Sequence, residues 1–194
     1  QNKSKKVYEA NITVFDALKK SDTDPNGKFF LERYISAHAI MISFEGIPAI
    51  YFNSLFGKSN DEAKYVITGN NRDVNRYKWS YENITKKLKD KNSKQSIFCQ
   101  NLGKLLEIKR KQKAFHPNAK RLNINLGSKL FCFKRISLDN KQTIISITNC
   151  SSVDQYPKLN KKYSKWKNII NPKINSLNKS FKLKPFETMW LSNK

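Results

Sequence analysis

The residues that could do chemistry gather in one short polar run, Asn70–Arg76. The run holds two arginines, Arg72 and Arg76, one acid, Asp73, and three amides. Guanidinium, amide and carboxylate groups together offer the donors and acceptors that a polyhydroxylated or anionic ligand requires. The run therefore predicts a binding loop for a ligand of that kind.

An apolar segment about twenty residues earlier, Gly46–Phe52, must help to position that loop. The segment is β-branched and aromatic and is opened by a Gly and a Pro, which predicts a buried parallel strand. A buried strand that leads into a polar loop is how a β/α barrel builds its binding face. We therefore expect barrel-type architecture in this part of the chain.

Three segments show helical spacing. Phe29–Phe44 predicts a helix, and we expect its His38 to lie in the core. Tyr81–Leu88 predicts a second, short helix. One broad apolar face of the first segment carries Phe30, Tyr34, Ala37, Ile40, Met41 and Phe44. A longer helix is predicted over Ile97–Lys113, with a buried stripe of Phe98, Leu102, Leu105, Leu106 and Ile108.

The pattern changes after His116, where short β-rich runs separated by turn residues begin. The runs are Leu122–Leu126, Lys129–Ile136, Gln142–Thr148 and Phe186–Leu191. They predict an antiparallel β module with Trp166 and Trp190 in its packing. The expected fold class is α/β plus all-β: the last strands and helices of a (β/α)8 barrel over residues 1–115, then a small C-terminal antiparallel β-sandwich over residues 116–194.

The charge of the chain raises two hypotheses about partners. With 38 basic and 15 acidic residues the net charge is +23, which prompts the question of nucleic acid or an anionic membrane. Only six of the basic residues are Arg, and the lysines are scattered in pairs such as Lys19-Lys20 and Lys161-Lys162. No run approaches the ~18–20 apolar residues of a membrane span. We expect neither nucleic acid nor a membrane as partner.

The cysteines suggest the compartment. Cys99, Cys132 and Cys150 show no CxxC spacing and are an odd number, so neither a zinc site nor a disulfide framework is predicted. Buried thiols in a reducing compartment are the simplest interpretation, and we expect a cytoplasmic protein without metal or cofactor. The first residue is Gln1 and not Met, which indicates a processed chain or a fragment.

Several motifs taken in order resemble one enzyme family. They are VYEANITVFDAL, GIPAIYFNSLFGKSND, NNRDVNR, KLLEIKRKQKAFHPNA and a closing PFETMWL. This order resembles the C-terminal portion of the sucrose phosphorylase-like and glucosylglycerate phosphorylase-like enzymes of the α-amylase superfamily, glycoside hydrolase family 13. The resemblance covers nearly the whole chain. It implies a retaining α-glucoside phosphorylase whose substrates are a small α-glucoside and inorganic phosphate.

The resemblance also implies roles for individual residues. Arg72 matches an arginine that hydrogen-bonds glucose hydroxyls, and Asp73 and Asn75 flank it as supports of the loop or further substrate contacts. Tyr8 and Glu9 match a mobile loop that lines the acceptor site. Sucrose phosphorylases commonly have Gln where this chain has Glu9, so the resemblance leaves room for glycerate, glycerol or a phosphorylated sugar in place of fructose.

No catalytic residue is expected within these 194 residues. In the family the nucleophile, the acid/base and the stabilising carboxylate all precede the segment that matches Tyr8, as do about six of the eight barrel strands. We therefore expect the chain to be a C-terminal fragment, inactive alone, whose partner is the missing N-terminal half of the barrel. Two alternatives stay open: a non-catalytic carbohydrate-binding remnant or module, and a basic nucleic-acid-binding protein.

Overall fold

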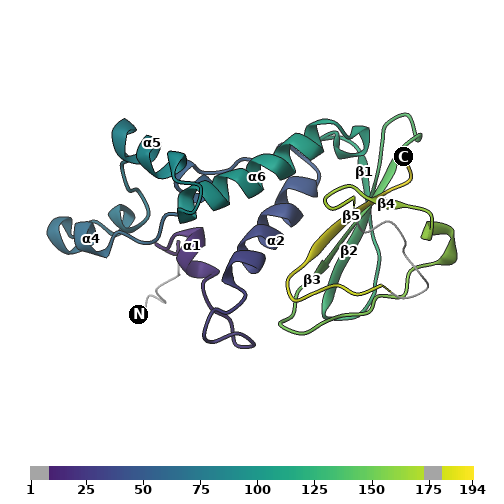
Figure 1. The fold of residues 1–194 in the computed structure, drawn as a ribbon, viewed down its shortest axis with the longest axis horizontal. Coiled ribbons are helices and arrows are strands. Elements are labelled where there is room, and N and C mark those ends of the chain that lie inside the picture. The colour runs from purple at the N-terminus through teal and green to yellow at the C-terminus, as the bar shows by residue number, and fades with distance from the viewer. Residues whose placement is uncertain (1–8, 173–180) are drawn as a thin grey trace, which may run out of the picture. The chain divides into compact units, whose positions relative to one another are not determined.

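The computed structural model describes residues 9–172 and 181–194, which group into two compact units (Figure 1). The first, here called the helical unit, contains residues up to Lys19 together with Ile50–Cys99. The second, here called the sheet unit, contains Lys20–Ala49 together with Gln100–Lys194.

The helical unit is built from short helices that are joined by capped turns. Its elements are α1 (Val14–Ala17), α3 (Phe52–Leu55), α4 (Glu62–Thr68), the 3-10 helix η1 (Asn71–Val74), α5 (Tyr81–Lys89) and the first part of α6 (Lys94–Arg110). The predicted helices over Tyr81–Leu88 and Ile97–Lys113 are thus confirmed, although α6 begins and ends three residues earlier than expected. Three residues of the predicted stripe, Phe98, Leu102 and Leu105, are buried.

Side-chain amides hold the helical unit together. The Asn60 side chain accepts a hydrogen bond from the Thr13 amide at 2.8 Å, and the Asn60 amide donates to the Asp16 carboxylate. Buried Asn53 accepts from the Trp79 indole at 2.9 Å and donates to the Tyr77 carbonyl at 3.0 Å. These bonds connect segments that are far apart in sequence, and so they fix the loops between the short helices.

The strand predicted over Gly46–Phe52 is not formed, and this prediction was wrong. Residues 47–51 have no regular structure, and Ile47 is 84% exposed. A strand needs a neighbour whose N–H and C=O groups complete its ladder. None of the strands found in residues 9–172 and 181–194 pairs with this segment.

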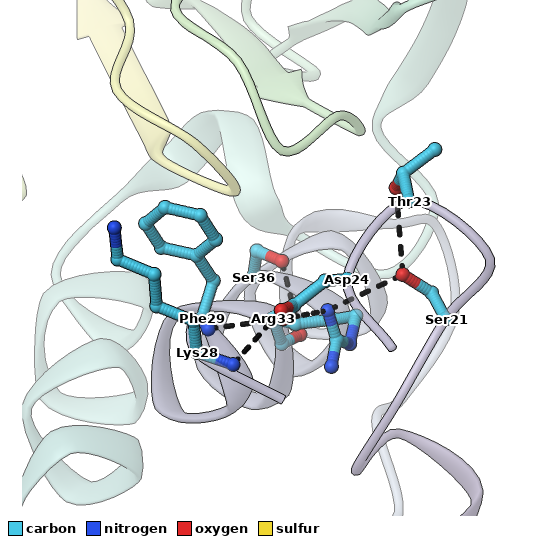
Figure 2. Close-up of polar contacts among 7 residues, drawn as sticks. All are labelled: Ser21, Thr23, Asp24, Lys28, Phe29, Arg33 and Ser36. Carbon is cyan, nitrogen blue, oxygen red and sulfur yellow. Dashed lines mark hydrogen bonds and ion pairs between the residues drawn. The ribbon is translucent and has the colours of Figure 1, made fainter. Parts of the chain in front are cut away.

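Helix α2 (Phe30–Ser43) begins the sheet unit and has a polar anchor at its start (Figure 2). The Asp24 carboxylate accepts from the amides of Lys28 and Phe29, at 2.8 and 3.0 Å, and pairs with Arg33 Nη1 at 2.9 Å. Burial acts to raise the pKa of Asp24, but the bonds from Phe29, Arg33 and Lys28 outweigh it, so the pKa is lowered. Asp24 therefore accepts hydrogen bonds from backbone amides that have no partner within the helix, and its charge balances that of Arg33.

The predicted helix over Phe29–Phe44 is confirmed, but its predicted apolar face was mostly wrong. Only Tyr34 of that face is buried, and the helix instead buries Arg33, Tyr34, Ser36, His38, Ala39, Ile42 and Ser43. His38 is in the core as expected, with Nδ1 at 2.8 Å from the Tyr34 carbonyl oxygen. The polar residues can be buried because each finds a partner within the chain, as Ser43 does with the Ala39 carbonyl at 2.7 Å.

One antiparallel sheet of five strands forms the rest of the sheet unit, in the order β1-β2-β3-β5-β4. The strands are β1 (Lys120–Asn123), β2 (Leu130–Ile136), β3 (Thr143–Asn149), β4 (Lys167–Asn168) and β5 (Thr188–Ser192). Two short 3-10 helices, η2 (Lys113–Phe115) and η3 (Lys161–Tyr163), lie in the connections. This sheet confirms the expected β module, and the four predicted runs coincide with β1, β2, β3 and β5 to within a few residues.

The core of the sheet lies on both faces of β3. One face contributes Ile145 and Ile147, both fully buried, to a cluster completed by Cys132, Phe181, Leu183, Met189 and Leu191. On the other face the Ser146 hydroxyl lies 3.2 Å from that of Ser43 at the end of α2. Trp190 is fully buried and Trp166 packs partly buried against the cluster, as expected.

The cysteines differ in exposure. Cys132 is buried, which raises the pKa of its thiol to about 12, whereas Cys99 is half-buried. Cys150 is exposed, so the prediction of a buried thiol was wrong there because the residue follows the last position of β3. All three thiols are free. None of the helices in the described residues is both long and apolar enough to span a membrane.

Candidate functional site

Local turns position Arg72. Helix α4 ends at Gly69, which has the left-handed φ of 64° that glycine adopts readily. The chain then enters η1, where the Asn70 side chain accepts from the Arg72 amide at 3.1 Å. Gly69 thus ends α4 and Asn70 caps η1, and the Arg72 side chain in η1 is half-exposed.

The Arg72 guanidinium forms a two-pronged ion pair with Glu9. Nε lies 3.0 Å from Oε1 and Nη2 lies 3.3 Å from Oε2. The hydrogen bond and the charge of Glu9 raise the pKa of Arg72, so the guanidinium stays charged. This paired geometry is the one in which arginine also binds two adjacent hydroxyls, a carboxylate or a phosphate.

Asp73 supports the loop. Its carboxylate pairs with Lys64 of α4 at 3.3 Å. A hydrogen bond from the Thr68 hydroxyl is the main cause that lowers the pKa of Asp73. Burial acts to raise this pKa, but the Thr68 bond together with the contact to Lys64 outweighs it. Asp73 thus ties η1 to α4.

A cavity of about 390 Å³ opens beside the Arg72–Glu9 pair. Its lining consists of Glu9, Ala10, Asn11, Tyr51, Arg72, Asn75 and Arg76. The two arginines and one carboxylate give it net positive charge, while the amides and the tyrosine add neutral donors and acceptors. Such a lining can hold a sugar by its hydroxyls or an anion by its charge.

The cavity brings together three of the five predicted site residues. Glu9, Arg72 and Asn75 line it, whereas Asp73 does not. Tyr8 lies outside the described residues. The Asn75 backbone carbonyl also accepts from the Asn53 side chain at 3.3 Å, which fixes the loop behind the cavity.

Four residues that line the cavity were not among the five predicted site residues: Ala10, Asn11, Tyr51 and Arg76. Two signals pointed to them. Arg76 lies four residues after Arg72 in the same polar run, and Tyr51 lies at the end of the apolar segment that precedes it. Neither signal says which side chains turn toward Glu9, because that depends on folding of the whole unit.

Metal chemistry has no ready ligand set in the described part of the chain. Over residues 9–172 and 181–194, no three His, Cys, Asp or Glu side chains gather closely enough to hold an ion. The groups that line the cavity are guanidinium, amide and carboxylate groups, which can bind and orient a ligand.

Curated relatives carry the names of glycoside phosphorylases. The glucosylglycerate phosphorylase of Escherichia coli K12 is 29% identical over 184 residues, which are 95% of this chain and 32% of the relative. That of Spirochaeta thermophila is 30% identical over 76% of this chain and 25% of its own length. The sucrose phosphorylase of Agrobacterium vitis is 37% identical over 37% of this chain and 13% of its own length. The chain thus spans about a third or less of the relatives it matches.

Solved structures show the same fold class. The AmyP E221Q structure in complex with maltotriose has a TM-score of 0.68 at 16% identity and covers 87% of this chain and 36% of that protein. Trehalose-6-phosphate hydrolase of Bacillus licheniformis has a TM-score of 0.63 at 14% identity, over 89% of this chain and 40% of that protein. At these identities the likeness shows the fold, which is that of the α-amylase superfamily.

One comparison disagrees. A family model described as 20S proteasome chaperone assembly proteins 3 and 4 matches residues 18–156. The matched residues include β3 but not β5, although these two strands are hydrogen-bonded neighbours in one sheet. The match therefore includes only part of the sheet. The phosphorylase relatives and the solved structures instead cover up to 95% and 89% of the chain and agree with each other. By sequence the chain is a homologue of glucosylglycerate and sucrose phosphorylases, and its structural neighbours are enzymes of the α-amylase family, glycoside hydrolase family 13.

Proposed function

We propose that this chain supplies the substrate loops and the C-terminal β domain of a retaining α-glucoside phosphorylase, of the glucosylglycerate or sucrose type. The observation that carries the proposal is the cavity in which Arg72, Arg76, Asn75 and Glu9 converge. Its positive charge and its neutral polar groups suit an enzyme that must bind both a sugar and inorganic phosphate.

The proposed reaction has two steps at the anomeric carbon. A carboxylate displaces the aglycone while a second carboxyl group protonates it, and phosphate then takes the glucosyl group with net retention of configuration. The two carboxyl groups belong to a region of the enzyme upstream of the matched segment. This chain's contribution is to bind and orient, and a retaining enzyme of this kind needs no cofactor.

Arg72 and Arg76 have distinct tasks in this proposal. The planar fork of Arg72 holds two neighbouring hydroxyls of the donor glucosyl unit, or the carboxylate of a glycerate. Arg76 adds the second positive charge, which favours phosphate over water in the second step. Asp73 holds the loop through Lys64 and does not touch sugar.

Glu9 regulates which ligand reaches Arg72. Its carboxylate already occupies the fork, so any ligand that binds to that fork, whether sugar hydroxyls or an anion, must displace Glu9. Tyr8 belongs to the same proposed loop.

The proposal includes the division of the chain and its partners. Residues 1–115 complete the catalytic barrel together with the upstream half of that barrel, and residues 116–194 form the C-terminal β domain. The location is cytoplasmic, where free thiols such as those of Cys99, Cys132 and Cys150 stay reduced.

A chimeric enzyme tests the proposal. The 194 residues are joined to the upstream region of the Escherichia coli glucosylglycerate phosphorylase, in place of the segment with which they align. The chimera is then incubated with phosphate and either glucosylglycerate or sucrose, and products are followed by ³¹P NMR. The proposal predicts α-glucose 1-phosphate from one of them. A folded chimera that binds both sugars without any turnover would instead support a non-catalytic carbohydrate-binding module.

A further inference from the structure

A second cavity, of about 490 Å³, lies entirely within the sheet unit. It is lined by residues 109–113 and 115–117, at and after the end of α6, and by residues 137–139 in the turn between β2 and β3. It shares no residue with the cavity around Arg72. Its volume is in the range of sites that hold small organic molecules.

Cationic side chains dominate the lining of this cavity. The cations are Lys109, Arg110, Lys111 and Lys113. Among the described residues of the lining only Asp139 is acidic, so four cations and one carboxylate give a net charge of +3 when the histidine is neutral. The carbonyls at the C-terminal end of α6 together carry only about half an elementary negative charge, which is too little to balance that excess. The cavity therefore favours an anion.

Two of the four cations have no carboxylate partner. Lys111 and Lys113 form ion pairs at 2.6 and 3.4 Å. In the part of the chain that the structure describes, no carboxylate forms an ion pair with Lys109 or Arg110. Arg110 is exposed, so its guanidinium is accessible to a ligand. An arginine fork binds two oxygens of a phosphate group at once.

A buried positive charge lies behind the wall of the cavity. Arg135 is fully buried, and its guanidinium donates to the carbonyl of His116, a lining residue, at 2.7 Å. Its acceptors among the described residues are backbone carbonyls alone, and its Nε has none. Burial and, next, the charge of Arg135 lower the pKa of Lys109, whose ammonium donates to the Phe115 carbonyl at 3.0 Å. An anion in the cavity would offset this positive charge, with which no described carboxylate pairs.

Part of the lining is apolar. Phe115 is buried and Pro117 is half-buried, whereas the Leu138 side chain is 61% exposed. A ligand with an apolar part would remove this leucine surface from water, which is favourable. The lining thus suits an anion with an apolar body better than inorganic phosphate.

We propose that this cavity binds a small phosphate monoester, with the phosphate group beside Lys109 and Arg110 and the apolar part of the ester against Leu138. The site does not depend on the proposed phosphorylase function, and its loss should leave phosphorolysis unchanged. It requires no catalytic group and no upstream barrel half, and so it can be tested in the 194-residue chain.

The test is a titration of the ¹⁵N-labelled chain with phenyl phosphate and, separately, with inorganic phosphate and phenol, followed by NMR. Saturable shifts of the backbone amides of Gln112, Lys113 and Asp139 are expected with phenyl phosphate. Inorganic phosphate should shift the same amides with lower affinity, and phenol, which lacks the charge, should not shift them. Arg110→Gln should weaken binding of phenyl phosphate about tenfold, because charge-assisted hydrogen bonds to the phosphate group are lost.

Lys89→Gln is the matched control, since it makes the same change of charge at an exposed position of α5 and should leave the affinity unchanged. Leu138→Asn, at an exposed position of the turn, should weaken binding of phenyl phosphate about threefold and leave that of inorganic phosphate unchanged. Arg72→Ala should leave the titration unchanged, which separates this site from the proposed phosphorylase site.

Three results would overturn the proposal. The first is that phenyl phosphate does not shift these amides. The second is that inorganic phosphate or phenol binds there as tightly as phenyl phosphate does. The third is that Arg110→Gln and Lys89→Gln bind phenyl phosphate with equal affinity.

Discussion

Glu9 and Arg72, 63 positions apart in the sequence, are joined by two parallel hydrogen bonds. Both side chains are partly exposed and line the same cavity. The arginine fork that a ligand would use is thus occupied by a carboxylate of the chain itself. Any anion that binds there must compete with Glu9, which makes this pair the clearest point at which to perturb the site.

Neutralising Glu9 should strengthen binding of phosphate. In Glu9→Gln the competing charge is gone, so we expect inorganic phosphate to bind the chain about two- to fivefold more tightly, the range expected for an exposed ion pair. Isothermal titration calorimetry at low ionic strength measures the effect. Glu82→Gln, which makes the same change of net charge at an exposed position outside the cavity, is the control. Equal affinities of Glu9→Gln and the parent chain would contradict the expectation.

Arg135 should be a main support of the sheet unit. It is fully buried, and its guanidinium donates to the carbonyls of Ser43 at 2.8 Å, His116 at 2.7 Å and Ala119 at 3.2 Å. Among the described residues nothing accepts a hydrogen bond from its Nε, and burial lowers the pKa of Arg135.

Arg135→Met should lower the free energy of unfolding by about 2–4 kcal/mol, because it leaves buried carbonyls without donors. Arg135→Lys, which keeps the charge but not the fork, should recover only part of the loss. Urea denaturation followed by circular dichroism measures both. If Arg135→Met is as stable as the parent chain, these hydrogen bonds do not support the fold.

The Asp24–Arg33 pair should make stability depend on pH in acid. The pKa of Asp24 is lowered in the folded chain, so its stabilisation is complete above about pH 4 and is lost as the pH falls through the lower folded value. Asp24→Asn should therefore lower the melting temperature by several degrees at pH 7, and the difference from the parent chain should shrink as the pH falls below 4. Thermal melts from pH 7 to pH 3 test this.

Asp22 provides the matched control for that series. It is exposed and lies two residues from Asp24, outside the hydrogen-bonded cluster of Figure 2. Asp22→Asn should show the melting profile of the parent chain. An equal effect of the two variants, or a constant difference for Asp24→Asn at every pH, would rule out the ion pair as the cause.

The three thiols should react at different rates with a thiol reagent at pH 8. Cys150 is exposed and should react first, and half-buried Cys99 should follow. Cys132, whose pKa is raised to about 12 by burial, should react only when the protein is unfolded in urea. Mass spectrometry of the labelled peptides identifies the order, and labelling of Cys132 before Cys150 in the folded chain would be inconsistent with this structure.

Local patterns predicted the elements that local forces determine. The stripe of α6 and the β-rich runs of β2 and β3 were visible because α6 buries one face at helical spacing and the strands are rich in β-branched and aromatic residues. The face of α2 was not predictable in this way. Arg33 is buried because Asp24, nine positions earlier, neutralises it, and no periodicity of apolar residues records such a pairing.

The residues of the site were also predicted only in part, because some of them are brought together by contacts between segments that are distant in the sequence. The polar run Asn70–Arg76 predicted a binding loop, and the family resemblance implied Arg72 and Asn75 as site residues. The inclusion of Tyr51 depends on how α3 and η1 fold together. The strand expected over Gly46–Phe52 would need a neighbouring strand to pair with, and none of the described strands pairs with this segment.

The most direct test of the account is the effect of Arg72→Ala on phosphorolysis by the chimeric enzyme. The account predicts that kcat/KM for release of glucose 1-phosphate falls at least about 100-fold, since the variant loses two charge-assisted hydrogen bonds to the donor sugar. Arg110→Ala, which removes an exposed arginine of α6 outside the Arg72 cavity, should retain full activity. If Arg72→Ala is folded and keeps the activity of the unaltered chimera, Arg72 does not bind the donor sugar and the central claim is contradicted.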